Sequence, residues 1–226
     1  MIPLRDDIPR STFPFVTIAI ILVNIVIFIY QLSIGDWGER LFVQRAGAIP
    51  YEITHLRDLH PPNLVPIPLT VFTALFIHGG LAHLTGNMLY LWIFGDNIED
   101  RLGHIRFLLF YLIAGMIATL SHVLLAPASH IPMIGASGAI AGILGAYLVL
   151  FPGATVSTLV FLFIFFDIIK IPAVVFLVLW FAVQLMSSGL GGGIAWYAHI
   201  GGFIAGVILI RIFLRGRKGL RAVSSR

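Results

Sequence analysis

The chain has 226 residues, of which 59% are hydrophobic and only 11% are charged. Because a soluble domain carries roughly 25% charged residues, this composition excludes an ordinary soluble enzyme and indicates a membrane protein. The net charge of +4 does not indicate nucleic-acid binding, because the basic residues gather in the tail 211–226, where they suit anionic lipid. The absence of cysteine excludes disulfides, thiolate metal sites and a cysteine nucleophile.

Six apolar stretches predict an all-α polytopic membrane protein, with a six-helix bundle in one domain over residues 1–226. A spanning helix needs about 20 mostly apolar residues. The first stretch follows a short N-terminus without a small-residue cleavage site, so we expect a retained helix and not a signal peptide. The second is expected to end before the charged run 96–101. The predicted spans are residues 13–32, 75–94, 105–125, 137–151, 171–187 and 197–214.

The connecting segments differ in character. Residues 35–68 are expected to form a polar loop, and residues 126–134 a short neutral loop with two prolines. Asp167 and Lys170 interrupt an apolar run, so we predict an interfacial or re-entrant piece over residues 155–166 before the fifth span. The glycine-rich run 189–193 is either a hinge for a gate beside that span or an ordinary flexible loop.

The distribution of basic residues predicts the orientation. With six spans and a cytoplasmic N-terminus, only Arg40, Arg45 and Arg57 of the 14 Lys and Arg residues would lie outside. Both termini are therefore expected in the cytoplasm. The short N-terminus has no Arg-rich transit peptide, which favours a plasma (inner) membrane over an organelle.

Four polar residues are expected on the outer side of the membrane. The second, fourth and sixth spans run in the same direction, and His83, Asn87, Ser137 and His199 lie near their starts. Residues 137–151 extend over roughly 22 Å as a helix, which is less than the hydrocarbon core of about 30 Å. Ser137 is therefore expected below the surface, in a cavity that admits water.

These residue types predict nucleophilic catalysis. A serine hydroxyl needs a base to take its proton, and neutral His199 suits that role near pH 7. No acidic residue lies in the apolar part of a span, so we expect a Ser137–His199 dyad without a buried carboxylate. The backbone N–H of Ser137, with His83 and Asn87 one turn apart, would form an oxyanion hole. Two small-residue patterns, from Gly138 to Gly142 and from Gly202 to Gly206, suit close packing of the two helices.

The chain resembles the rhomboid intramembrane serine proteases. The matching pieces, in chain order, are His83-x-x-x-Asn87, Gly95 with Glu99-x-Arg101-Leu-Gly103, Gly135-Ala-Ser137-Gly138 and Ala198-His199-Ile-Gly-Gly202-x-x-x-Gly206. The resemblance implies a catalytic Ser137–His199 dyad and an oxyanion hole of His83, Asn87 and the Ser137 amide. It implies substrates that are single membrane-spanning segments cut near their outer ends, with the bilayer as the other partner and no cofactor. The residues that would support the site are Gly135, Gly138, Gly202, Gly206, Glu99 and Arg101.

The chain departs from the family in two places. Leu69-Thr70 stands where the family often has Trp-Arg, about a dozen residues before the first histidine. Ala141 stands where some members carry a tyrosine that stacks on the catalytic histidine, which leaves open what orients His199.

The remaining polar residues are assigned structural roles. Asn24 and Gln184 are predicted to join helices, and Glu99 and Arg101 to form a structural pair at the cytoplasmic end. His78 either supports the site or fills a loop. The other histidines do not have metal-ligand spacing, so no metal site is predicted; they are His55, His60, His104, His122 and His130.

Three functions fit a membrane bundle with these residues. The first is an intramembrane serine endopeptidase. The second is a rhomboid-like pseudoprotease that binds or escorts membrane proteins, against which the retained Ser137 and His199 argue. The third is a small transporter or channel, which the absence of a visible inverted repeat disfavours.

Overall fold

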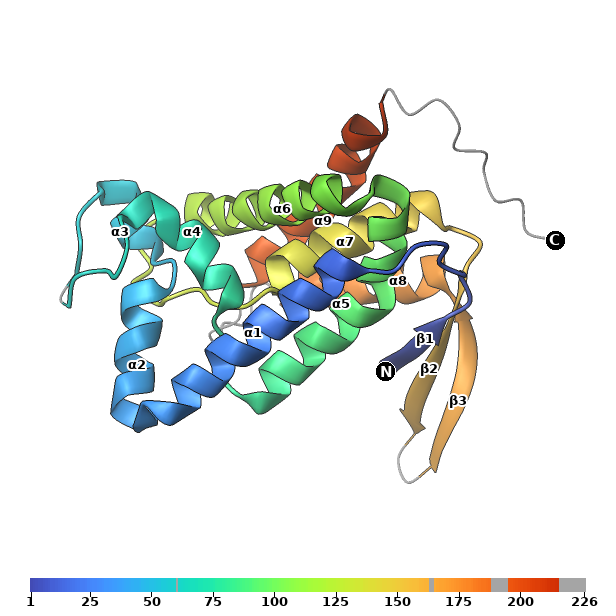
Figure 1. Ribbon diagram of the computed structural model, residues 1–226, viewed down its shortest axis with the longest axis horizontal. Helices are drawn as coiled ribbons and strands as arrows, with labels where there is room; N and C mark the ends of the chain where they lie inside the picture. The colour runs from blue at the N-terminus through green and yellow to red at the C-terminus, as the bar shows by residue number, and fades with distance from the viewer. Residues whose placement is uncertain (60, 163–164, 188–194, 216–226) are drawn as a thin grey trace.

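The computed structural model describes residues 1–59, 61–162, 165–187 and 195–215, and its main body is a bundle of helices (Figure 1). Five elements match predicted spans to within two residues at each end: α1 (Phe15–Ser33), α6 (His104–Leu125), α7 (Ser137–Leu150), α8 (Ala173–Ser187) and α9 (Trp196–Leu214). Helices α1, α6 and α8 run in one direction, and α5 (Leu81–Leu102), α7 and α9 in the other. We call the end where α1 begins and α5 ends the charged end.

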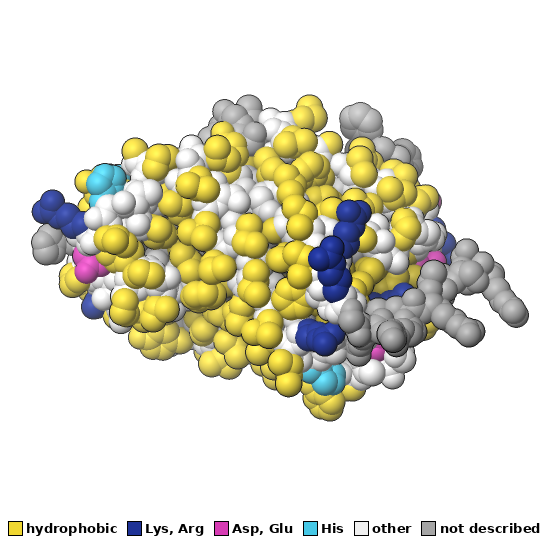
Figure 2. All heavy atoms as spheres, turned by 90° about the horizontal axis from the view of Figure 1, so that it is seen from above, with side chains coloured by type: hydrophobic (Ala, Val, Ile, Leu, Met, Phe, Trp, Pro, Cys, Tyr) yellow, Lys and Arg dark blue, Asp and Glu magenta, His cyan; other side chains and the backbone are white. Residues whose placement is uncertain are grey.

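The outer surface of the bundle is apolar. Hydrophobic side chains cover most of the face in Figure 2, and charged side chains gather toward its left end and in its right half. Three helices, α1, α6 and α9, are long and apolar enough to cross a bilayer, and a fourth crossing is formed if residues 67–76 and α5 act together across their 83° bend. Helices α7 and α8 are apolar but shorter. By length alone the described residues therefore contain three or four spans, and six spans stay a prediction.

The second predicted span is wrong at both ends. A break at Gly79 and Gly80 separates the short helix η2 (Ala74–Phe76) from α5, and Gly80 has a φ of 151° that L side chains rarely adopt. At its other end α5 continues through the predicted stop at residues 96–101. It continues because the charged side chains of that run find partners in the N-terminal segment, more than 80 residues away.

The predicted loop 35–68 is largely helical. It contains α2 (Gly35–Ala46) and α3 (Pro50–His55), and η1 (Ile67–Leu69) and α4 (Thr70–Thr73) lead to η2. Helix α2 carries Asp36 in its first turn and Arg45 in its last, charges that complement the helix dipole. The polar composition marked this segment as lying outside the core, but it did not exclude short helices.

The expectation of an all-α fold is also wrong. An antiparallel sheet of order β1-β2-β3 lies beside the charged end (Figure 1), formed by β1 (Ile2–Asp6), β2 (Thr155–Leu162) and β3 (Phe165–Pro172). The predicted interfacial piece 155–166 is thus a strand and the start of its hairpin partner. Its valine, isoleucine, threonine and phenylalanine residues favour strands. Asp167 and Lys170, opposite Val160 and Ser157, sit in the sheet outside the bundle.

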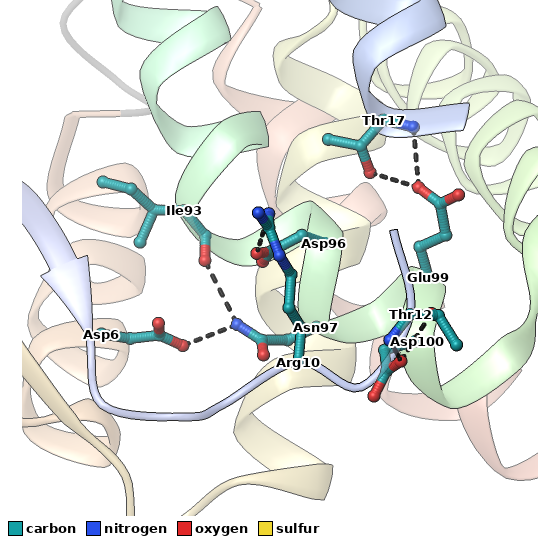
Figure 3. Close-up of polar contacts among 9 residues, drawn as sticks. All are labelled: Asp6, Arg10, Thr12, Thr17, Ile93, Asp96, Asn97, Glu99 and Asp100. Atoms are coloured by element: carbon teal, nitrogen blue, oxygen red, sulfur yellow. Dashed lines mark hydrogen bonds and ion pairs between the residues drawn. The ribbon is translucent and has the colours of Figure 1, made fainter. Parts of the chain in front are cut away.

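At the charged end Glu99 joins three helices. Its carboxylate accepts the backbone N–H of Val16 at 2.9 Å. It also accepts the backbone N–H and the hydroxyl of Thr17, each at 2.7 Å (Figure 3). His104 Nδ1 at the start of α6 lies 2.6 Å from the same carboxylate. These N–H groups belong to the first turn of α1, which has no intrahelical partners for them. Glu99 is fully buried and serves as the N-terminal cap of α1.

The neighbours of Glu99 extend this network. Asp100 accepts the Thr12 N–H at 2.8 Å and hydroxyl at 2.6 Å, and Arg10 pairs with Asp96 at 3.4 Å (Figure 3). The Arg101 guanidinium lies over the ring of Phe151, 5.2 Å from its centroid. Glu99 and Arg101 therefore support the fold through different partners, which is consistent with structural roles for both.

Replacing Glu99 by Ala is expected to destabilise the bundle strongly. The change removes the acceptor of three buried donors, so we expect the free energy of unfolding to fall by about 3 kcal/mol or more. Thermal unfolding in detergent would measure it. Replacing the exposed Asp36 by Ala is the control and is expected to change stability by less than about 1 kcal/mol; equal effects from both would contradict this role of Glu99.

Asp6 is expected to make stability depend on pH. Burial raises the pKa of Asp6 from 3.8 to about 6, and Asp96 and Asp7 act in the same direction, while the hydrogen bond from Tyr147 opposes them. The folded chain therefore holds a proton that the unfolded chain loses near pH 4. The stabilisation that comes from protonated Asp6 in the folded chain is present at low pH and is lost as the pH rises through about 6.

The measurement is the melting temperature of wild type and Asp6→Asn between pH 4 and 7. The variant should gain relative to wild type as the pH rises, because it has no carboxyl to ionise. A constant difference across this range would contradict the shift.

Candidate active site

The site rests on a very close approach of α7 and α9, which lie side by side in the bundle (Figure 1). A Cβ on Gly202 would overlap the carbonyl oxygen of Gly138, and one on Gly206 would overlap that of Gly142. On the other side of α7, Cβ atoms on Gly138 and Gly142 would lie 2.7 and 2.6 Å from alanines of α6. Only glycine permits this spacing, as the two small-residue patterns predicted.

This packing brings Ser137 and His199 together. Ser137 is the first residue of α7, and His199 lies in the first turn of α9. The Ser137 Oγ is 2.8 Å from the His199 Nε2. Two atoms 62 residues apart in sequence are therefore within hydrogen-bond distance, in the arrangement that activates a serine nucleophile.

A residue that sequence reasoning assigned to helix packing contacts this histidine. The Gln184 Oε1, near the end of α8, lies 2.7 Å from the His199 Nδ1. Gln184 is buried, with 6% of its surface exposed. A lone amide in an apolar helix is equally compatible with a helix-packing role and a histidine partner, so the sequence carried no signal to choose between them. The contact supplies a partner for His199 where Ala141 offers none.

His83 and Asn87 face the same cavity as Ser137. The Gly79 N–H donates to His83 Nδ1 at 3.4 Å, which leaves the His83 Nε2 as a donor. Gly135, two residues before Ser137, has a φ of 113°, and a Cβ there would lie 2.7 Å from that Nε2. The backbone before the serine therefore passes directly against His83, which only glycine allows.

His78 is part of this cluster and not loop filler. Its Nε2 lies 2.9 Å from the Asn87 Nδ2, and its backbone N–H and carbonyl both bond to the side chain of Gln31 at 3.2 and 2.9 Å. The side chain is fully buried. His78 thus holds one N–H of the Asn87 amide and leaves the other available to the cavity.

A cavity of about 860 Å³ joins these groups. Its lining includes Ser137, His199, His83 and Asn87, and the ring of Trp180. The volume accommodates a short peptide segment with water. Among the residues that the structure describes, no group of three or more His, Cys, Asp or Glu is arranged to hold a metal ion.

Three sequence features cannot be placed in the structure, among them the run predicted to be either a gate hinge or a flexible loop. The glycine-rich run 189–193, the basic tail from residue 216 onward and His60 lie outside the described residues. The structure brings four predicted site residues to one end of the bundle, opposite the charged end: Ser137, His199, His83 and Asn87.

A family model of the rhomboid domain matches residues 68–216, about two thirds of the chain. The chain belongs to the rhomboid family. The match covers every residue of the cavity named above, and with the apolar helices it makes the chain a multi-pass membrane protein.

Several curated relatives are similar to this chain. RHOMBOID-like protein 4 of Arabidopsis thaliana is 28% identical over 220 residues, which is 88% of this chain and 52% of that protein. Rhomboid protein 1, mitochondrial, of Saccharomyces cerevisiae is 32% identical over 65% of this chain and 42% of its own length. Rhomboid protease GluP of Bacillus subtilis is 44% identical over 34% of this chain and 15% of its own length. The chain spans about half or less of the length of these relatives.

Replacing Gly206 by Ala is expected to disrupt the site, although Gly206 is not among the residues that line the cavity. The added Cβ would overlap the Gly142 carbonyl and push α9 away from α7, which overpacks the interface at a cost of about 1–3 kcal/mol or more. We expect a lower melting temperature and slower labelling of Ser137 by a fluorophosphonate probe. Gly153→Ala, where a Cβ meets open space, is the control. Unchanged labelling and stability in Gly206→Ala would contradict the required spacing.

Proposed function

We propose that this protein is an intramembrane serine endopeptidase that cuts transmembrane segments of membrane proteins. The observation that carries the proposal is the 2.8 Å contact between Ser137 Oγ and His199 Nε2 inside a large cavity. Membership of the rhomboid family supports it, since GluP of Bacillus subtilis, a relative, is named a protease.

In the proposed mechanism the Ser137 hydroxyl attacks the carbonyl carbon of the scissile bond. Its proton passes to His199 Nε2, and the imidazolium then gives that proton to the leaving nitrogen. The acyl group stays on Ser137 as an ester. A water molecule, deprotonated by His199 in the same way, hydrolyses the ester and restores the hydroxyl.

The oxyanion of each tetrahedral intermediate needs donors. The backbone N–H of Ser137 stands at the start of α7, where the first N–H groups have no intrahelical partner and the helix dipole favours negative charge. The Nε2–H of His83 and the second N–H of Asn87 supply two further donors from α5.

The substrate class follows from the position of the site within an apolar bundle. A transmembrane helix hides its carbonyls in its own hydrogen bonds, so small or helix-breaking residues near the cut favour entry into the cavity. The bilayer is the other partner, and no nucleic acid or cofactor takes part. We further propose six crossings, with α7 and α8 completing those that length alone identifies, both termini in the cytoplasm and a location in the plasma (inner) membrane.

The experiment is cleavage of a model single-span substrate in liposomes by wild type, Ser137→Ala and His199→Ala. We expect product from wild type only, with losses of about 10³-fold or more in both variants, because nucleophile and base act as one unit. His130→Ala, an exposed histidine outside the cavity lining, is the control and should retain activity.

A fluorophosphonate probe on the same samples distinguishes the outcomes. Labelling of wild type without cleavage would mean an active enzyme offered the wrong substrate. Neither labelling nor cleavage by wild type would reject the protease and favour a pseudoprotease that binds membrane proteins.

A further inference from the structure

A chain of hydrogen bonds leads from a backbone carbonyl of α8 to the hydroxyl of Ser137. The Gln184 Nε2 lies 3.3 Å from the Trp180 carbonyl oxygen, and its Oε1 lies 2.7 Å from the His199 Nδ1. The His199 Nε2 in turn lies 2.8 Å from the Ser137 Oγ. The donor and acceptor roles of the two His199 nitrogens in this series of contacts depend on the tautomer of the ring.

The Trp180 carbonyl fixes the orientation of the Gln184 amide. A carbonyl oxygen only accepts hydrogen bonds, so the NH₂ group of Gln184 must face Trp180 and its oxygen must face His199. The reversed amide would place two oxygens against each other. The amide oxygen can then accept a hydrogen bond from His199 only if the ring carries its proton on Nδ1. The neutral imidazole is held as the tautomer with its proton on Nδ1.

The tautomer of His199 in turn decides how the ring contacts Ser137. With its proton on Nδ1, the neutral ring has a free lone pair on Nε2, and this atom accepts the Ser137 hydroxyl. The opposite tautomer would present an N–H to the serine and could not take its proton. Gln184 lines the cavity with only 6% of its surface exposed, so little of its side chain is open to water.

We propose that Gln184 is the positioning residue of this site: its amide oxygen holds the Nδ1 proton of His199 and keeps Nε2 free to take the serine proton. The inference rests on the proposed function for its kinetic consequence, but the tautomer of His199 can be measured independently. A carboxylate usually has this task in serine proteases. Here a neutral amide performs it, and no charged group is placed beside the histidine from α8.

Two substitutions separate positioning from general packing. Gln184→Met keeps the length of the side chain and removes the acceptor. We expect kcat and the rate constant for fluorophosphonate labelling to fall by about 10- to 100-fold, part of the 10²–10⁴ that a positioned base supplies, with KM unchanged. Gln184→Glu keeps an acceptor and adds a charge. It should restore most of the activity and move the acidic limb of the pH–rate profile to higher pH by about one unit or more.

The matched control is Val183→Met, at the neighbouring exposed position of α8. It should leave kcat and the pH profile as in wild type. A merely structural role for Gln184 would lower the melting temperature of Gln184→Met and Gln184→Glu alike and would not move the pH profile. Full activity in Gln184→Met, or an unshifted profile in Gln184→Glu, would overturn the proposal.

The direct measurement is ¹⁵N NMR of the His199 ring in detergent, which does not require activity. Wild type should show a single neutral tautomer protonated on Nδ1, and Gln184→Met a mixture of the two. The same single tautomer in both would overturn the inference even in an active enzyme. If wild type neither cleaves nor labels, the proposed function fails, while the NMR comparison still decides whether Gln184 sets the tautomer.

Discussion

Everything at the reactive end depends on the contact between α7 and α9. The backbones approach so closely that side chains are excluded at Gly202 and Gly206, because the carbonyl oxygens of Gly138 and Gly142 occupy that space. Lipid tails do not drive apolar helices together, so close backbone packing has to hold them. The same spacing fixes the distance between the first turns of both helices, where Ser137 and His199 meet. Stability and proposed chemistry therefore share one structural requirement.

The two ends of the bundle have different roles in the structure. At the charged end, Glu99 caps α1 and contacts α6, and Asp100 and Asp96 bind the segment that leads into α1. These bonds fix the helices where the chain enters and leaves the bundle. Around the cavity at the opposite end, the polar side chains that bond to one another are histidines, amides and the hydroxyl of Ser137.

The helices and the reactive pair could be predicted because their signals are local. Apolar runs locate α1, α6, α7 and α9, and parallel helix directions place Ser137 and His199 at one end. The extension of α5 was missed because the partners of Glu99 and Asp100 lie more than 80 residues away. The sheet was missed because its apolar strands resemble part of a span. Gln184 joins α8 to α9 as predicted, but its contact with His199 was missed because only the three-dimensional arrangement shows which group its amide faces.

The pairing of β1 with β2 has a consequence for how the chain threads a bilayer. Ile2 pairs with Leu159 and Asp6 with Val156, so both strands must lie on the same side of the membrane. The chain between them must therefore cross an even number of times. The bundle helices α1, α5, α6 and α7 meet this condition if all of them cross, or if two fall short together. A single helix that failed to insert would leave β1 and β2 on opposite sides, so the sheet can form only when an even number of these helices cross.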